Sequence, residues 1–176
     1  MNRQNRMCKV CFIALLVTLT ASRSYSQAIN YSVHANIIYH FTKYIDWPES
    51  KKTGDFIIGI VGESPLYSAL TNFVADKTAG DQKIVVKIYS HSEAVYGCQI
   101  LFISEEESSY LKKILLRTNG TPLLIVTESE GAAHAGSCIN FAIVFDHVKI
   151  EINKNNIELR HLNIASDLLQ LGKLVK

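Results

Sequence analysis

Histidine, cysteine and carboxylate side chains are the residues of this chain that could bind a metal or catalyse a reaction. The six histidines are scattered over five segments: His34 and His40 lie in one predicted helix, and the others are His91, His134, His147 and His161. No His-Glu-x-x-His pair is present, and Cys8 and Cys11 lie inside the N-terminal export segment described below. This pattern favours surface or core histidines over ligands. We therefore expect no metal site and no cofactor.

A glycine-containing turn, Gly59 to Ser64 (GIVGES), follows an apolar run and precedes a helix-start signal. Phosphates bind at such turns in doubly wound folds, where backbone N–H groups of a helix N-terminus face the ligand. The turn lacks the third glycine of the dinucleotide fingerprint and the lysine of a P-loop, so a tight turn is favoured. A ligand cleft at the carboxyl ends of the strands, near Gly62, Glu63 and Ser104, is the alternative.

Two further patterns resemble catalytic motifs without meeting their requirements. Glu105, Glu106 and Glu107 are consecutive acids at a predicted helix start, where the helix dipole and solvation explain them. Gly136-Ser137-Cys138 lacks the Gly-x-Ser-x-Gly spacing of a nucleophile elbow. The sequence therefore contains no catalytic constellation, and we expect a protein that is not an enzyme.

Cys98 and Cys138 are the cysteines that remain after export. In an oxidising compartment, a pair of cysteines more often forms a disulfide than a metal or redox site. A bridge between them would close a loop of about 40 residues and stabilise the fold by roughly 4 kcal/mol in the chain-entropy model. The alternative is two unrelated buried thiols.

Aromatic residues are concentrated near the end of the first predicted helix, at Tyr39, Phe41, Tyr44 and Trp47. Core packing explains most of them. Trp47 precedes Pro48, and an exposed tryptophan is a typical interface anchor. We therefore consider Trp47, with Tyr44, a candidate partner interface, and burial of Trp47 the alternative.

The N-terminus has the layout of a secretory signal peptide. Arg3, Arg6 and Lys9 precede an apolar run over residues 10–19, and small and polar residues follow up to Ser26. The run is shorter than the roughly 20 residues that a spanning helix needs. We expect cleavage near Ser26 and a periplasmic location.

Loss of this leader changes the charge of the chain. Residues 1–26 contain four basic and no acidic residues, so the formal net charge falls from +2 to −2. A nucleic-acid partner is therefore not expected. Residues 27–176 suffice for one ordinary domain, and we expect a single α/β domain there after the signal peptide of residues 1–26.

The hydrophobic pattern of the mature chain predicts alternating helices and strands. Helices are expected over residues 30–44, 64–74, 105–117 and 165–175, and strands over 56–61, 84–89, 100–104 and 123–126. Two further β-rich runs, 139–145 and 148–152, predict a hairpin with the second strand at an edge. The fold class is α/β: a flavodoxin-like or Rossmann-like, largely parallel sheet with helices on both faces and a C-terminal β-hairpin plus helix.

Several of these segments together resemble the YfiR family of periplasmic proteins. The matching residues are Ala35, Phe41, Tyr44 and Trp47-Pro48 in the first helix, Gly97 to Ile103 (GCQILFI), Gly136 with Ile139-Asn140-Phe141, and Val148, Ile150 to Asn153, Ser166, Leu168 and Leu169. The chain departs from the family pattern at Ile150, where an aromatic residue is usual. It also has two mature cysteines where better-known relatives carry two disulfides.

The resemblance implies a small, often dimeric α/β protein that binds the periplasmic sensing domain of a membrane-bound diguanylate cyclase and represses it. Release of that repression under redox or envelope stress would raise cyclic di-GMP and favour biofilm growth. The partner expected here is such a cyclase or a sensor kinase. A periplasmic small-molecule-binding protein is the alternative function, and an exported hydrolase with a spatially assembled site is a third.

Overall fold

The structure is a computed structural model that describes residues 29–144 and 147–176. The predicted signal peptide, with Cys8 and Cys11, lies outside the described residues. Within them, no helix is both long enough and apolar enough to cross a bilayer.

The first described helix, α2 (Tyr31–Tyr44), matches the predicted helix. It begins where the Asn30 side chain accepts a hydrogen bond from the Ser32 backbone N–H at 3.1 Å, which satisfies a free donor of the first turn. Its buried face is formed by His34, Ala35, Ile38 and Phe41, at the helical spacing of the apolar pattern.

Eight strands form one sheet in the order β10-β8-β7-β6-β5-β2-β4-β3. Five of them run parallel to one another: β2 (Phe56–Val61), β4 (Gln82–Tyr89), β5 (Ile100–Ile103), β6 (Leu124–Thr127) and β7 (Ile139–Val144). The other three are β3 (Thr78–Ala79), antiparallel to β4, β8 (His147–Ile152), antiparallel to β7, and β10 (Lys173–Leu174), parallel to β8. A separate antiparallel pair joins β1 (Ile45–Asp46) to β9 (Asn163–Ile164).

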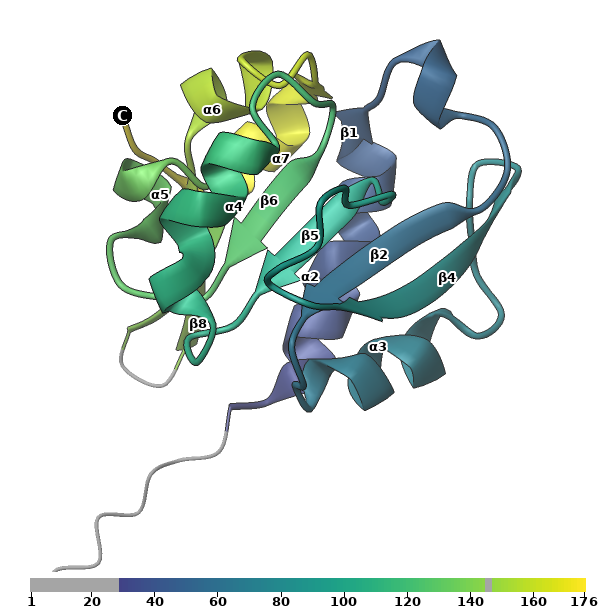
Figure 1. The fold of residues 1–176 in the computed structure, drawn as a ribbon, viewed down its shortest axis with the longest axis horizontal. Coiled ribbons are helices and arrows are strands. Elements are labelled where there is room, and N and C mark those ends of the chain that lie inside the picture. Colours follow the sequence, from purple (N-terminus) through teal and green to yellow (C-terminus); the bar gives the residue numbers. More distant parts are fainter. Residues whose placement is uncertain (1–28, 145–146) are drawn as a thin grey trace, which may run out of the picture.

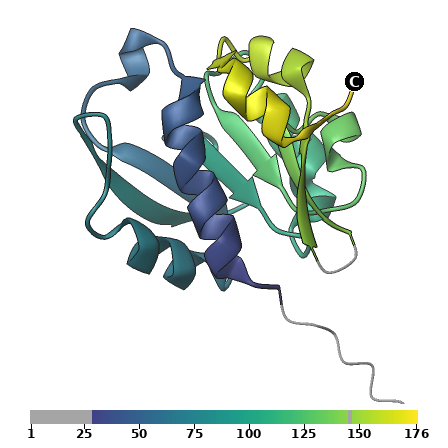
Figure 2. The ribbon, with the colours of Figure 1, turned by 180° about the vertical axis from the view of Figure 1, so that it is seen from behind.

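Helices cover both faces of this sheet. Figures 1 and 2 show α2 and α7 (Ser166–Leu171) on one face and α4 (Leu111–Arg117) on the other. The remaining helices are α3 (Leu66–Val74), α5 (Ala132–Ala135), α6 (Lys154–Glu158) and the 3-10 turns η1 (Glu49–Lys51) and η2 (Ser108–Tyr110). The covered faces explain why β5 and β6 are buried at every position.

The five parallel strands follow the order second, first, third, fourth, fifth along the chain. A doubly wound sheet changes winding direction between its first and third strands, here β2 and β5. The chain differs from the flavodoxin-like expectation because residues 90–99, between β4 and β5, contain no helix.

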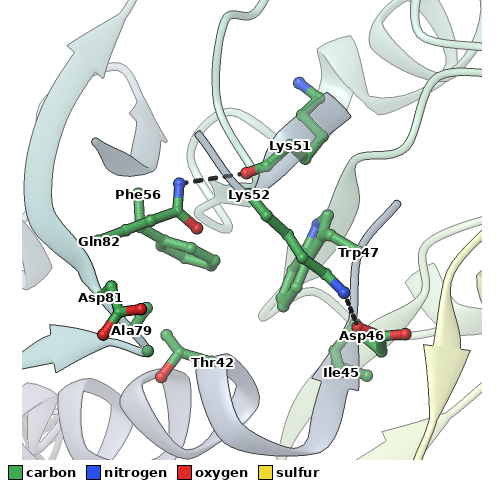
Figure 3. A pocket seen from close by; sticks show the side chains of 11 residues that line it. Thr42, Ile45, Asp46, Trp47, Lys51, Lys52, Phe56, Ala79, Asp81 and Gln82 are labelled. Carbon is green, nitrogen blue, oxygen red and sulfur yellow. Dashed lines mark hydrogen bonds and ion pairs between the residues drawn. The ribbon is translucent and has the colours of Figure 1, made fainter. Parts of the chain in front are cut away.

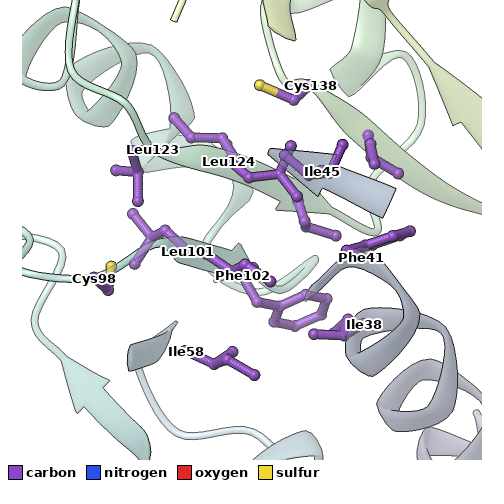
Figure 4. Packing of buried hydrophobic residues seen from close by; sticks show 14 of the residues in the cluster. Ile38, Phe41, Ile45, Ile58, Cys98, Leu101, Phe102, Leu123, Leu124 and Cys138 are labelled. Atoms are coloured by element: carbon purple, nitrogen blue, oxygen red, sulfur yellow. The ribbon is translucent and has the colours of Figure 1, made fainter. Parts of the chain in front are cut away.

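The core lies between α2 and the central strands. Figure 4 shows Ile38 and Phe41 of α2 beside Phe102 of β5, all fully buried, while Leu101 of β5 lies on the other side of the sheet. Phe41 also stacks on Phe141 of β7 at 6.2 Å between ring centroids. The hydrophobic effect of this layer fixes α2 across the sheet.

Three predicted elements differ from the structure. The helix expected over 105–117 begins only at Leu111, because turns with backbone bonds such as Glu107 N–H to Ser104 O occupy the acidic segment. The last helix ends at Leu171, and the chain then extends into β10. As a result β8 is an edge strand only over residues 147–150, since β10 pairs with Glu151 and Ile152.

Candidate functional site

Cys98 and Cys138 do not form the predicted disulfide. Both are fully buried free thiols. Cys98 lies just before β5 and Cys138 just before β7, and β6 runs between those strands. Two strand spacings amount to about 10 Å, whereas a disulfide needs Cα atoms within about 7 Å. Figure 4 shows the two sulfur atoms on well-separated parts of the core.

Trp47 is not the exposed anchor that the sequence allowed. Its side chain is buried, with 5% of its surface exposed, and Nε1 donates a hydrogen bond to the Gln99 carbonyl oxygen at 3.2 Å. The ring meets Phe56 edge-on, with centroids 5.0 Å apart. Tyr44 is half-buried and stacks on His40. Trp47 is therefore part of the hydrophobic core.

One pocket lies beside Trp47 and is shown in Figure 3. Its volume is about 290 Å³, and Trp47, Phe56 and Ile45 form its apolar side. Its polar side includes Gln82, whose amide donates to the Lys51 carbonyl oxygen at 3.2 Å, and an ion pair between Lys52 and Asp46 at 2.9 Å. Because Phe56 and Gln82 begin their strands, this pocket lies at the amino ends of β2 and β4.

At the carboxyl ends of the strands, where a ligand cleft was the alternative prediction, a carboxylate of the protein lies beside Gly62. Gly62, with φ of 71°, directly follows β2, and the Glu107 carboxylate lies directly against it. Glu63 is exposed, while Ser104 is fully buried and its Oγ has no hydrogen-bond partner among the described residues. The structure thus brings Glu107 to the place where a phosphate would lie, and like charge disfavours an anion there.

A buried polar cluster near these strand ends was not predicted from the sequence. Tyr31 Oη donates to Glu128 Oε1 at 3.0 Å, and His34 Nε2 lies 3.6 Å from Glu128 Oε2. His34 Nδ1 faces the Asn30 carbonyl oxygen at 3.4 Å and can only donate to it, so the assigned tautomer leaves Nε2 as an acceptor. Two acceptors therefore face each other and require a proton between them.

Burial decides where that proton resides. Desolvation raises the pKa of Glu128 to about 7, opposed by the hydrogen bond from Tyr31 and one from the Glu105 backbone, while Glu106 and Glu105 raise it further by charge repulsion. Desolvation lowers the pKa of His34. Both shifts favour the uncharged forms, so a neutral histidine facing a protonated carboxyl group is the favoured state just below pH 7.

A groove lies beside the C-terminal hairpin, and we call it the hairpin groove. It has a volume of about 460 Å³ and includes Ile37 of α2, Ala142 and Val144 of β7, Val148 of β8, and Leu171 and Lys173 at the end of the chain. Val144 and Leu171 are exposed large apolar residues, at 41% and 67%. The unpaired edge of β8 over residues 147–150 borders it. Exposed apolar surface beside an open strand edge is typical of a protein-binding site.

The sequence located only part of this groove. The predicted edge strand is there, but the contribution of α2 and of residues 171–173 depends on the tertiary fold.

No group of three His, Cys, Asp or Glu side chains in residues 29–144 and 147–176 is placed to hold a metal ion.

Comparison with known families and proteins supports one assignment. The family described as YfiR/HmsC-like matches residues 31–173, from the first turn of α2 to β10. Among curated proteins, none matches the chain. The family match includes every strand of the sheet except the last residue of β10. The chain therefore belongs to the YfiR/HmsC-like family.

Proposed function

We propose that this protein is a periplasmic regulator that binds the periplasmic sensor domain of a membrane-bound signalling protein and represses it. The family match over residues 31–173 carries this proposal. A diguanylate cyclase is the proposed partner, so release of the regulator would raise cyclic di-GMP. Repression of this kind requires that the regulator bind the inactive state of its partner more tightly than the active one.

The hairpin groove is the proposed contact surface. The N–H and C=O groups on the open side of β8, residues 147–150, can pair with an extended segment of the partner. Val144 and Leu171 would then bury apolar side chains of that segment, and Lys149 and Lys173 lie beside them as charged rim residues. The proposed occupant is thus one strand of the sensor domain, added to the sheet at β8.

Co-purification of the mature, tagged protein with solubilised membranes tests this proposal when matched variants are compared. Val144→Asn and Leu171→Asn should each weaken capture of the cyclase by about tenfold, which corresponds to about 1.4 kcal/mol of lost apolar burial. Ile143→Asn is the control. Ile143 is also exposed, at 53%, and it is not among the residues that line the groove.

The same variants should raise cyclic di-GMP in cells, while Ile143→Asn should leave it unchanged. If all three variants capture the cyclase equally well, the partner does not bind at the hairpin groove. If the wild-type chain captures no membrane signalling protein, the proposed regulatory function is wrong.

A small-molecule-binding role is the second candidate, favoured by the pocket beside Trp47. Its volume, about 290 Å³, is at the lower end for a small-ligand site. A ligand there should raise the melting temperature, and Lys52→Gln should reduce that rise because Lys52 lines the pocket. Lys77→Gln, outside the pocket, is the control.

A further inference from the structure

A second groove lies between α4 and the turn that follows α6, and it shares no residue with the hairpin groove. Its volume is about 340 Å³. Leu115 and Leu116 of α4 and Leu159 form apolar walls, and Lys112 and Arg160 supply two cations. We call it the Arg160 groove.

Arg160 is buried, with 6% of its surface exposed, although guanidinium groups are seldom buried without an anion. Its Nη1 donates to the Thr118 carbonyl oxygen at 3.0 Å and to Thr118 Oγ1 at 3.3 Å, at the C-terminal end of α4. Among the described residues, none of the ion pairs involves Arg160. The cap on α4 uses one nitrogen of the guanidinium and leaves the positive charge without a carboxylate partner.

The surroundings of Arg160 favour an anion with an apolar part. Lys112 is exposed on α4 and adds a second positive charge, and no acidic residue lines the groove. Leu116 and Leu159 are each 72% exposed, so the groove presents apolar surface to solvent next to its cations. A guanidinium group matches a carboxylate through two parallel hydrogen bonds.

We propose that the Arg160 groove binds a free carboxylate that carries an apolar chain, such as a medium-chain fatty acid. The carboxylate pairs with Arg160 and Lys112, and the chain lies against Leu115, Leu116 and Leu159. This site is separate from the hairpin groove, because the two surfaces are lined by different residues.

Calorimetric titration of the mature protein with decanoate, below its micelle-forming concentration, tests this site. Decanol provides the same chain without the charge and should bind at least about tenfold more weakly, since a charge-assisted pair contributes more than 1.4 kcal/mol. Arg160→Lys should weaken decanoate binding by about tenfold, because the paired hydrogen bonds are lost. Lys112→Gln should weaken it by about threefold, and Lys113→Gln, exposed on the same helix but outside the groove, should leave it unchanged.

Leu116→Asn keeps the test decisive if Arg160→Lys does not fold, because Leu116 is exposed and its replacement should remove chain binding only. Equal affinities for decanoate and decanol would overturn the proposal, as would equal decanoate affinities in Lys112→Gln and Lys113→Gln. Binding to vesicles of anionic lipid without binding of decanoate would also overturn it, in favour of a lipid headgroup.

Discussion

Cys98 and Cys138 lack the environment of redox-active thiols. Burial raises the pKa of Cys98 to about 12, opposed by the charge of Lys51, and that of Cys138 to about 11, opposed by Arg160. The thiolate is the reactive form, so both side chains are poor nucleophiles at neutral pH. A signal that acts through these two residues would first have to expose them.

Alkylation of the mature protein without reductant should show the low reactivity of Cys98 and Cys138 directly. In native buffer neither cysteine should react within minutes, and in denaturant both should react, as counted by mass spectrometry. If both cysteines stay unreactive in denaturant until reductant is added, they form a disulfide. That result would contradict the free thiols and the separation of the two residues by β6.

The pair of Glu128 and His34 should set the pH dependence of stability. Between the ordinary pKa values of 4.5 and 6.5 the two shifts act in opposite directions: the raised pKa of Glu128 makes stability fall as the pH rises, and the lowered pKa of His34 makes it fall as the pH falls. Above pH 6.5 only the Glu128 contribution remains, so stability falls up to about pH 7. Below pH 4.5 Glu128 is protonated in both states, and stability falls with pH until His34 is protonated in the folded state as well.

Glu128→Gln mimics the protonated carboxyl group and should separate the two contributions. Its stability relative to the wild type should grow from near zero at pH 4.5 to on the order of 3 kcal/mol above pH 7, from a pKa raised to about 7. Thermal unfolding across this range measures the difference, with Glu130→Gln at an exposed neighbouring position as control. A difference that does not change with pH would show that Glu128 ionises as it does in solvent.

At the scale of single elements, the end of α2 is attached to the sheet through the segment that contains Trp47. β1 pairs with β9, and Trp47 bonds to Gln99, just before β5. Gln99 also accepts from the Ile57 backbone N–H through its side chain and donates to the Lys51 carbonyl oxygen. This short segment therefore connects α2, the start of β2 and the start of β5.

Trp47→Ala should lower the free energy of unfolding by about 3 to 5 kcal/mol, because it leaves a cavity beside Phe56 and removes the bond to Gln99. Trp47→Phe should cost less, since it keeps much of the ring. Urea titration of both variants measures these changes. If the urea midpoint of Trp47→Ala is unchanged, Trp47 is not a buried core residue and becomes a candidate interface residue again.

The whole molecule is organised around the central parallel strands. β2, β5 and β6 each have a strand on both sides, whereas β3 and β10 are two-residue strands at opposite ends of the sheet. Both faces of the central strands are covered by helices (Figures 1 and 2). The sheet should therefore open from its ends inward.

Hydrogen exchange should report this order. Amides of β5 and β6 should exchange slowest, close to the rate set by global unfolding, and those of β10 and of residues 147–150 should exchange fastest within the sheet. Addition of the bound partner should slow exchange selectively at residues 147–150 if β8 is the docking edge. Uniform protection across all strands would mean that the hairpin edge does not open separately.

The sequence by itself determined the elements whose signals are local. Apolar runs marked β2, β5 and β6, helical spacing and Asn30 marked α2, and two β-rich runs predicted the β7–β8 hairpin, because burial of one or both faces leaves a periodic trace. The order of motifs also predicted the family. The acidic segment 105–107 was wrongly assigned to a helix, because acidic residues are favourable at a helix N-terminus but do not by themselves make the segment helical.

Only the tertiary structure decided which residues meet across the sheet. The strand order placed β6 between Cys98 and Cys138, put Glu107 against Gly62, and brought His34 to Glu128 over 94 positions of sequence. It also buried Trp47 and joined α2 to the end of the chain in the hairpin groove. Such contacts leave no periodic signal, since they depend on how strands are ordered and helices are packed, and a single sequence records only the pattern within each element.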